Sequence, residues 1–309
     1  MARWGAPRVT VVAVVGPTAS GKTALGVELA LRLGGEVVNA DSMQLYRGMD
    51  IGTAKATPEE RRGVPHHVLD VWDVTEPADV KRYQELARAA IADVAARGRV
   101  PVLVGGSGLY VRAVLDRFEF PATDADLRAH FEMRLAAEGS GALHAELASR
   151  DPVAAAAIEP SNARRVVRAL EVVELEGSFA AVLPATIDYV RPTVTLGLRP
   201  SRVELDERVE RRVERMWAAG FVDEVRSLAE RSGLRDGVTA RRALGYAQLL
   251  RALDGEIGLE QARAETVQAT RRFVRRQESW FRRDQRITWL DPGRADVLEQ
   301  SLAVVSAAG

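Results

Sequence analysis

The segment Val9–Thr23, VTVVAVVGPTASGKT, joins a run of β-branched residues to a glycine-rich turn. Such a run is typical of a strand that is buried on both faces of a parallel sheet. Residues 16–23 fit the pattern G-x-x-x-x-G-K-[ST], and apolar residues at helical spacing follow over Thr23–Leu33. In a strand–turn–helix setting, the backbone N–H groups of this turn bind phosphate oxygens. The segment therefore predicts a P-loop for a di- or triphosphate, and we disfavour a chance match.

Strands and helices alternate beyond this segment, which predicts an α/β fold with a P-loop NTPase-like parallel sheet wrapped by helices. Asp79–Ala96 is expected to be an amphipathic helix with Asp79 as its cap, and Gly105–Gly108 should turn the chain into another helix. Further strands are predicted at Glu36–Ala40, His67–Val71, Val100–Val104 and Thr193–Leu198.

The character of the chain changes near Arg117. Residues 117–190 are predicted to form a mostly helical insertion, with two short helices in Asp124–Arg150 broken at Gly139–Gly141 and a third at Asn162–Glu176. Residues 1–116 and 191–309 should form the core domain, whose C-terminal part is nearly all helix. Ser201 is a suitable cap for the first of these helices, with Glu204 completing a capping box.

Composition bounds the functions that the chain can have. The 309 residues include 43 basic and 43 acidic side chains, so the formal net charge is zero, and there is no cysteine. The absence of cysteine excludes disulfides, iron–sulfur clusters, thiolate zinc sites and a cysteine nucleophile. The apolar run Val11–Val15 is far too short to span a membrane, and no signal peptide is recognisable. We expect a cytoplasmic protein, and a monomer.

Two further sites are expected beside the P-loop. Asp41 follows a predicted strand, and Ser107 follows another, so both should lie at the sheet edge that carries Lys22. A carboxylate beside a phosphate site binds metal or handles a proton, although Asp41 could instead cap a helix. The predicted strand Val100–Val104 ends in Gly-Gly-Ser rather than in the aspartate that holds Mg²⁺ in P-loop hydrolases and kinases. Asp41 and Asp70 are possible substitutes.

These features, in this order, resemble the tRNA dimethylallyltransferase family, the bacterial tRNA isopentenyltransferases. The resemblance runs through nearly the whole chain, and DSMQLYRGMDIGTAK at 41–55 is its most specific segment. Other resembling segments are GPTASGKT at 16–23, PHHVLDV at 65–71, VGGSGLYVRAVLD at 104–116, DPVAAAAIEPSNARRVVRALEV at 151–172, ERVERRVERMWAAGFVDEV at 207–225, RALGYAQL at 242–249 and RRQESWFRR at 275–283.

The resemblance implies a reaction and a set of catalytic residues. The family transfers a dimethylallyl group from dimethylallyl diphosphate to N6 of adenosine 37 in tRNAs reading codons that begin with U, and Mg²⁺ assists as pyrophosphate leaves. Asp41 would accept the proton of N6, and Ser107 and Arg212 would complete the catalytic site. Thr23 would bind the metal, and the diphosphate would be held by Gly16, Pro17, Thr18, Ala19, Ser20, Gly21, Lys22 and Thr23.

The resemblance also implies contacts with tRNA. The resemblance places Arg212 near the diphosphate, and Arg208 shares its helix face, so both could point at the site, although each could instead form a surface ion pair. Tyr246, Trp280 and Phe281 are candidates for stacking with the extruded adenine, although the last two are better explained as core residues. The tRNA contacts are expected from Asp41, Ser42, Met43, Gln44, Ser107, Arg128, Arg164, Arg165, Arg168, Arg242, Gly245 and Tyr246.

The distribution of charge agrees with an RNA partner. Residues 1–190 carry 21 basic and 25 acidic side chains, whereas residues 191–309 carry 22 basic and 18 acidic ones. The zero net charge is therefore a cancellation between two parts of the chain, and it predicts a salt-dependent affinity for tRNA.

Two other functions fit parts of the sequence. A small-molecule or nucleotide kinase would use the same P-loop with ATP, and residues 117–190 could imitate its lid. A non-catalytic RNA-binding protein with a vestigial P-loop is the third hypothesis. The segment at 41–55 disfavours the kinase, and intact Lys22, Thr23 and Asp41 disfavour the binding module.

Overall fold

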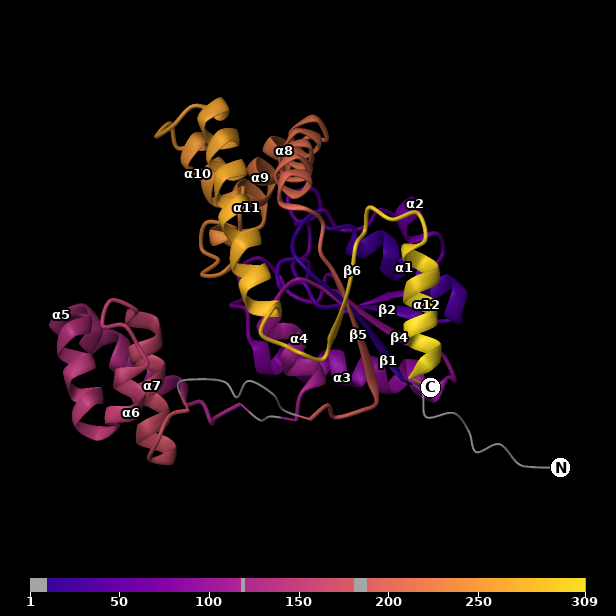
Figure 1. Ribbon diagram of the computed structural model, residues 1–309. Helices are drawn as coiled ribbons and strands as arrows, with labels where there is room; N and C mark the ends of the chain where they lie inside the picture. Colours follow the sequence, from indigo (N-terminus) through magenta and orange to yellow (C-terminus); the bar gives the residue numbers. More distant parts are fainter. Residues whose placement is uncertain (1–9, 118–119, 181–187, 309) are drawn as a thin grey trace. The chain divides into compact units, whose positions relative to one another are not determined.

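The computed structural model describes residues 10–117, 120–180 and 188–308, and in them a six-stranded sheet forms the centre of the core (Figure 1). The strand order is β3-β2-β4-β1-β5-β6, and every pairing is parallel. The strands are β1 Val11–Val15, β2 Glu36–Asn39, β3 His66–His67, β4 Pro101–Gly105, β5 Thr193–Leu198 and β6 Ile287–Leu290.

The strand β1 is buried on both faces, as its β-branched sequence predicts. Val11, Ala13 and Val15 point into the core that includes α3 (Val80–Ala96) and α4 (Gly108–Leu115). Val12 and Val14 point into the opposite core, under α1 (Lys22–Leu33) and α12 (Val297–Ala307). Figure 1 shows these two helix layers on either side of the sheet. The predicted α/β class is confirmed.

The chain after β5 forms the helical C-terminal part of the core domain. Ser201 Oγ accepts a hydrogen bond from the N–H of Glu204, so the predicted cap is confirmed. The Glu204 side chain contacts Ser201 Oγ rather than the Ser201 N–H, so the reciprocal half of the capping box is not formed. The elements are α8 Arg202–Ala218, α9 Phe221–Arg231, η1 Ala240–Arg242, α10 Tyr246–Leu253 and α11 Leu259–Phe281.

Contacts divide the chain into one unit of residues 1–116 and 188–309 and a second unit of residues 117–187, so the second boundary lies slightly before the predicted one. The second unit contains α5 Ala125–Arg150, α6 Pro152–Ala156 and α7 Ala163–Glu176. Its core is formed by apolar side chains of these helices. Gly139 has φ 82° and ψ 163°, which breaks α5 where the sequence predicts two helices.

Several short elements were not predicted. β6 lies in a stretch that was expected to be helical, and α2 (Pro58–Arg61) and α6 lie in stretches with no expected element. The predicted strand His67–Val71 is wrong over most of its length, because only His66 and His67 pair with β2. Asp79 caps α3 as predicted, accepting from the N–H groups of Lys81 and Arg82. No helix in the described residues could cross a membrane.

Candidate functional site

The P-loop connects β1 to α1 and has the strained backbone of an anion-binding loop. Gly16 has φ 141°, and a Cβ there would lie 2.6 Å from the carbonyl oxygen of Leu198, so a side chain does not fit. Ala19 and Gly21 also have positive φ, at 65° and 94°. This geometry places successive N–H groups of the loop around one concavity at the N-terminus of α1.

Polar groups of the loop are poised for an anion. Ser20 Oγ is buried and makes no hydrogen bond. Lys22 Nζ folds back and donates to the carbonyl oxygen of Pro17 at 2.6 Å. Burial lowers the pKa of Lys22 to about 7; the Asp41 carboxylate opposes this shift and the Arg212 guanidinium adds to it. An unpartnered hydroxyl and a destabilised ammonium are the groups that a phosphate would satisfy.

Asp41 lies beyond the end of β2 and beside Lys22, as predicted. Its N–H donates to Asn39 Oδ1 at 2.9 Å, and its Oδ1 accepts from the N–H of Met43 at 2.9 Å. No helix begins at this position in the described residues, so Asp41 stabilises a turn rather than a helix N-terminus. Its carboxylate also lines the cavity described below, where a ligand can reach it.

Ser107 connects the turn that holds Asp41 to the loop after β4. Its Oγ accepts from the N–H of Ser42 at 3.2 Å and donates to Ser42 Oγ at 3.3 Å. Ser107 is the N-cap residue of α4, but its side chain makes no capping hydrogen bond. Its hydroxyl is therefore used at the cavity and not at the helix N-terminus.

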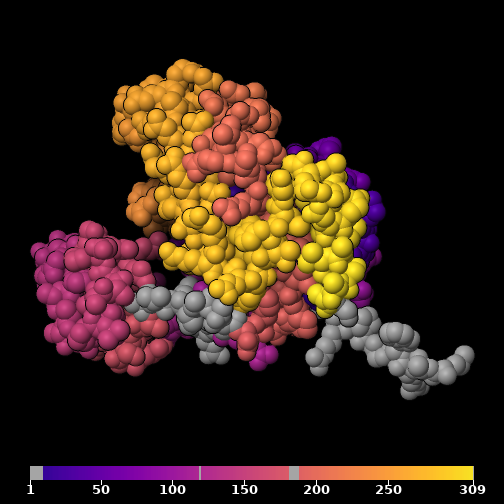
Figure 2. Space-filling view, viewed as in Figure 1, coloured from indigo at the N-terminus to yellow at the C-terminus, as the bar shows by residue number. Residues whose placement is uncertain are grey.

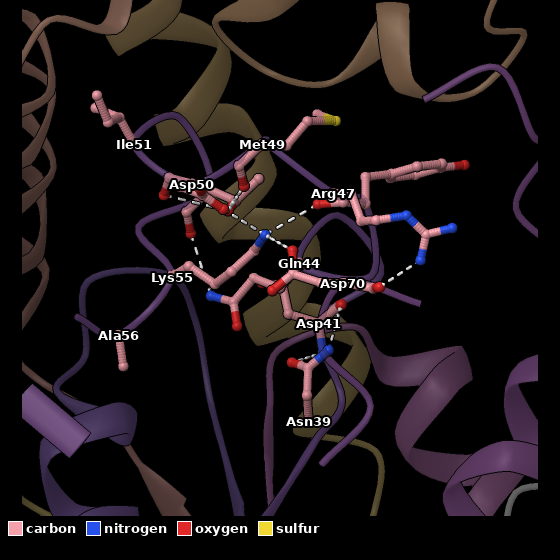
Figure 3. A network of polar contacts seen from close by, with 12 residues as sticks. Asn39, Asp41, Gln44, Arg47, Met49, Asp50, Ile51, Lys55, Ala56 and Asp70 are labelled. Atoms are coloured by element: carbon pink, nitrogen blue, oxygen red, sulfur yellow. Dashed lines mark hydrogen bonds and ion pairs between the residues drawn. The ribbon is translucent and has the colours of Figure 1, made fainter. Parts of the chain in front are cut away.

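The segment 41–55 is organised around a buried lysine (Figure 3). Lys55 Nζ donates to the carbonyl oxygen of Tyr46 at 2.9 Å, to Asp50 Oδ1 at 2.6 Å and to Asp70 Oδ1 at 2.5 Å. Asp70 is thus an ion-pair partner, which disfavours it as a substitute metal ligand. Gln44 Nε2 donates to the carbonyl oxygens of residues 53 and 54, so its amide holds this segment together.

The helical C-terminal part supports the same segment through Glu224 on α9. Its two carboxylate oxygens accept from the N–H groups of residues 50–52, at 3.0, 2.6 and 3.1 Å. Tyr246 donates its hydroxyl to Glu224 Oε1 at 2.6 Å, and its ring lies edge-on to Phe221 with an exposed fraction of 0%. Tyr246 also belongs to the lining of the cavity described below, and its predicted stacking role stays a prediction.

A cavity of about 280 Å³ lies between the loops at the carboxyl ends of the strands and helices α8, α10 and α11. It brings together many of the predicted site residues, but Gln44 and Gly245 do not line it, and of the P-loop residues 16–23 it is lined by Thr18 alone. One wall is contributed by the loops: Thr18, Asp41, Ser42, Met43, Gly52, Thr53 and Ser107. The other comes from the C-terminal part: Arg212, Val213, Met216, Arg242, Ala243, Leu244, Tyr246, Thr266, Thr270, Phe273 and Arg276.

The two arginines predicted on one face of α8 have different surroundings. Arg212 lines the cavity and donates from Nη2 to the carbonyl oxygen of Thr53 at 3.1 Å, and burial lowers its pKa. Arg208 instead forms an ion pair with Glu204 at 2.9 Å, one turn earlier on the helix. Arg212 is therefore the site residue of the two.

Gln277 on α11 is a site residue that the sequence analysis missed. Its Oε1 accepts from the N–H of Thr18 at 2.9 Å, and its Nε2 donates to the carbonyl oxygen of Gly106 at 2.8 Å. The side chain is 6% exposed. It thus holds the P-loop and the loop after β4 at a fixed separation. The segment RRQESWFRR, which contains Gln277 and resembles the family, could have indicated a functional residue here. No spacing rule, however, connects residue 277 to residue 18.

The predicted arginines of the second unit are partly used within it. Arg128 and Arg168 both pair with Glu171, each at 2.9 Å, and Glu171 is buried. Arg164 and Arg165 are exposed on α7. The tRNA contacts of these four residues stay predictions. Trp280 is 39% exposed, whereas Phe281 is 3% exposed, so the core interpretation is confirmed for Phe281 and wrong for Trp280.

Comparisons with known proteins identify the family. The model of the family described as IPP transferase matches residues 44–284. The chain belongs to the IPP transferase family. It is 62% identical over 302 residues to a tRNA dimethylallyltransferase from Thermobifida fusca, covering 96% of this chain and 94% of the relative. The family assignment makes it a transferase.

Solved structures of relatives share the fold. A full-length tRNA isopentenylpyrophosphate transferase from Bacillus halodurans is 42% identical, with a TM-score of 0.72 and 96% of each chain covered. A eukaryotic dimethylallyltransferase acting on tRNA is 25% identical, with a TM-score of 0.80, covering 97% of this chain and 80% of that one. The resemblance drawn from the sequence is confirmed at the level of the family.

Replacing Gln277 should impair donor binding in this IPP transferase. In Gln277→Leu, the buried N–H of Thr18 and carbonyl of Gly106 lose their partners, and the P-loop loses its attachment to α11. We expect KM for the diphosphate donor to rise about tenfold, with a smaller change in kcat. Steady-state kinetics with varied donor concentration would measure both. Gln261→Leu, an exposed glutamine on the same helix, is the control. A fall in thermal stability with an unchanged donor KM would contradict the positioning role.

Proposed function

We propose that this member of the family transfers a dimethylallyl group from dimethylallyl diphosphate to N6 of adenosine 37, in tRNAs reading codons that begin with U, and releases pyrophosphate. The observation that carries the proposal is the closeness of the anion-binding loop to Asp41: Thr18 of the loop and Asp41 line one cavity, and the Asp41 carboxylate raises the pKa of Lys22 against the effect of burial. The names of the relatives, which are tRNA dimethylallyltransferases and a transferase acting on tRNA, support the two substrates.

The donor side of the cavity is built to accept negative charge. The bond from C1 of the dimethylallyl group to the diphosphate oxygen breaks, and the charge on that oxygen grows as it does. Arg212 lines the cavity, and Lys22 can exchange the carbonyl oxygen of Pro17 for a diphosphate oxygen. Together with the positive end of the α1 dipole, both side chains can stabilise this growing charge. The unpartnered hydroxyl of Ser20 supplies one more donor.

The residues present fit a Mg²⁺ ion that is held largely by the substrate. The Thr23 side chain is exposed at the start of α1, and no cluster of three carboxylate, histidine or cysteine ligands occurs in the part of the chain that the structure describes. Mg²⁺ characteristically binds through few protein ligands together with phosphate oxygens and water. When bound by Thr23 and the diphosphate, it would supply neutralising charge for the leaving group.

The acceptor side requires a base. The N6 amine is a weak nucleophile because its lone pair is delocalised into the adenine ring. As N6 forms its bond to C1, its proton passes to the Asp41 carboxylate, which increases the electron density on nitrogen. Ser107 is hydrogen-bonded to Ser42 beside Asp41 and thus holds the turn in place. Its hydroxyl is also available to the adenine of the tRNA.

The comparisons do not favour the kinase alternative. β4 ends at Gly105, and Gly106 and Ser107 follow it, so no carboxylate occupies the place of the Mg²⁺-binding aspartate of P-loop kinases. Asp70, the other substitute, is paired with Lys55.

One assay tests the proposed reaction. The protein is incubated with unmodified tRNA, radiolabelled dimethylallyl diphosphate and Mg²⁺, and ATP is monitored in a parallel reaction. We expect the label to enter the tRNA at adenosine 37 and ATP to remain intact. Consumption of ATP without labelling of tRNA would instead establish a kinase, and tight tRNA binding with neither event would indicate a binding module.

A further inference from the structure

We propose that Glu224 on α9 is a positioning residue for the reaction, which acts by fixing the guanidinium of Arg212 through the backbone of residues 50–53. The inference rests on the proposed function, because it assigns to Arg212 the diphosphate that leaves in that reaction. Glu224 does not line the cavity, whereas Arg212 does. Three sets of contacts connect the two side chains: the carboxylate holds a turn, the turn presents a carbonyl group, and the carbonyl group orients the guanidinium.

The carboxylate of Glu224 accepts four hydrogen bonds. Its Oε2 accepts from the N–H groups of Asp50 and Ile51, at 3.0 and 2.6 Å. Its Oε1 accepts from the N–H of Gly52 at 3.1 Å and from the hydroxyl of Tyr246 at 2.6 Å. Both oxygens are thus occupied by neutral donors, and three consecutive N–H groups of the backbone are held in one direction.

These N–H groups belong to a compact turn that is packed closely against the helical part. Two backbone hydrogen bonds of 3.0 Å close residues 50–55. A Cβ on Gly52 would lie 2.1 Å from Phe221 Cε2 and 2.5 Å from Tyr246 Cε2, so a side chain does not fit there. Both rings are fully buried, although atoms of α8 and α10 are visible at the surface of the face shown in Figure 2. Rotation of the turn would therefore break its contacts with Glu224.

The turn presents the carbonyl oxygen of Thr53 to the cavity arginine. This oxygen accepts from Arg212 Nη2 at 3.1 Å and from Gln44 Nε2 at 3.2 Å. It is the one hydrogen-bond partner of the Arg212 side chain in the part of the chain that the structure describes. The orientation of the guanidinium thus depends on where the turn places this oxygen.

A carbonyl group orients Arg212 without neutralising its charge. A carboxylate in the same place would form an ion pair and would compete with the diphosphate for the guanidinium. The charge of Glu224 is instead bound by the N–H groups of the turn and the hydroxyl of Tyr246. The remaining N–H donors of Arg212 are therefore kept for the charge that grows on the leaving group.

A purely structural role for Glu224 makes a different prediction. If the carboxylate only attached α9 to the segment 41–55, its loss would lower stability, and any effect on anion binding would be independent of Arg212. If it positions Arg212, its effect on anion binding disappears once the guanidinium has been removed. The coupling between the two side chains therefore distinguishes the two roles.

The test is a double-mutant cycle of Glu224→Gln and Arg212→Ala, with inorganic pyrophosphate and Mg²⁺ as the probe. In Glu224→Gln, one oxygen becomes an amino group that faces two donors, so two of the four hydrogen bonds are lost whichever way the amide lies. Isothermal titration calorimetry measures the Kd of pyrophosphate for the wild type, the single variants and the double variant. Glu230→Gln, at an exposed glutamate on the same helix, is the control.

Thermal melting verifies that each variant is folded. If Glu224→Gln does not fold, Glu224→Asp takes its place in the cycle. The aspartate keeps the charge, but its side chain is one methylene too short for the carboxylate to reach all three N–H groups.

We expect Glu224→Gln to weaken pyrophosphate binding by about tenfold and Arg212→Ala by about thirtyfold, since a charge-assisted contact is misplaced in the first and lost in the second. The double variant should bind within about twofold of Arg212→Ala, because the carboxylate has nothing left to orient. Glu230→Gln should bind like the wild type. In the transfer reaction, Glu224→Gln should lower the saturated turnover by about tenfold and leave KM for tRNA within about twofold.

The other outcomes separate this role from the proposed reaction. Losses that multiply in the double variant, or equal weakening in Glu230→Gln, would overturn the positioning role and leave the reaction intact if the wild type labels tRNA. A Glu224→Gln variant that melts earlier but binds pyrophosphate normally would do the same. A wild-type protein that shows the coupling without labelling tRNA would reject the reaction and confine the role of Glu224 to the binding of diphosphate. A wild-type protein that does not bind pyrophosphate would overturn both proposals.

Discussion

Asp41→Ala should lose turnover by about a hundredfold to ten-thousandfold while its affinity for tRNA stays within about twofold of the wild-type value. The carboxylate is the group in the cavity that can accept the proton of N6 as the carbon–nitrogen bond forms. It also neutralises the positive charges of Lys22 and Arg212, whose pKa values it raises against the effect of burial. Single-turnover transfer of labelled dimethylallyl groups and a separate tRNA-binding titration would measure the two quantities.

Asp41→Asn separates the chemistry from the geometry. An asparagine can still accept the hydrogen bond from the N–H of Met43, so the turn after β2 should keep its shape. It cannot take up a proton, so we expect it to be nearly as inactive as the alanine variant. An asparagine variant with most of the wild-type turnover, or an alanine variant that loses tRNA affinity but not saturated turnover, would be incompatible with a base at position 41.

The sequence predicted the part of the site that depends on strand ends. β1, β2 and β4 are apolar runs of recognisable length, and the carboxyl ends of parallel strands meet at one edge of the sheet. For that reason the proximity of Asp41, Lys22 and Ser107 could be inferred before the structure was known. The presence of the insertion and its first boundary could be predicted because the sequence changes in character near residue 117, where the alternation of strands and helices stops.

The part that could not be predicted depends on long-range packing. Gln277 binds the P-loop across 259 residues of sequence, and Glu224 binds the segment 41–55 across more than 170. No periodicity encodes such contacts. Helical spacing placed Arg208 and Arg212 on one face, but it could not show that only Arg212 reaches the cavity. The hydrogen bond of Tyr246 to Glu224 could not be predicted for a similar reason, because it depends on how α9 and α10 pack.

The second large effect is expected at Lys22, whose pKa of about 7 makes donor binding depend on pH. An incoming diphosphate would replace the carbonyl oxygen of Pro17 as the partner of the ammonium and would raise its pKa again. At pH 8 the free lysine is largely neutral, so binding of dimethylallyl diphosphate should be accompanied by uptake of a proton. At pH 6 the lysine is already charged, so donor binding should no longer be accompanied by proton uptake at Lys22. Calorimetry in buffers of different ionisation enthalpy measures this uptake directly.

Lys22→Met should abolish the proton uptake at pH 8 and weaken donor binding by about a hundredfold, since a charge-assisted contact is lost. Lys81→Met removes an exposed lysine on α3 and should change neither quantity. The same uptake in Lys22→Met as in the wild type would place the titrating group elsewhere.

The depressed pKa of Lys22 also has a consequence for the protein without ligand. The unfolded chain keeps its lysine protonated up to the ordinary value of 10.5, whereas the folded chain releases that proton near 7. Between these values the unfolded state binds more protons, so the contribution of Lys22 to stability rises with pH across this window. Below pH 7 the cost of burying the charged ammonium is fully present. The gain in melting temperature of Lys22→Met over the wild type should therefore be largest below pH 7 and shrink toward pH 10.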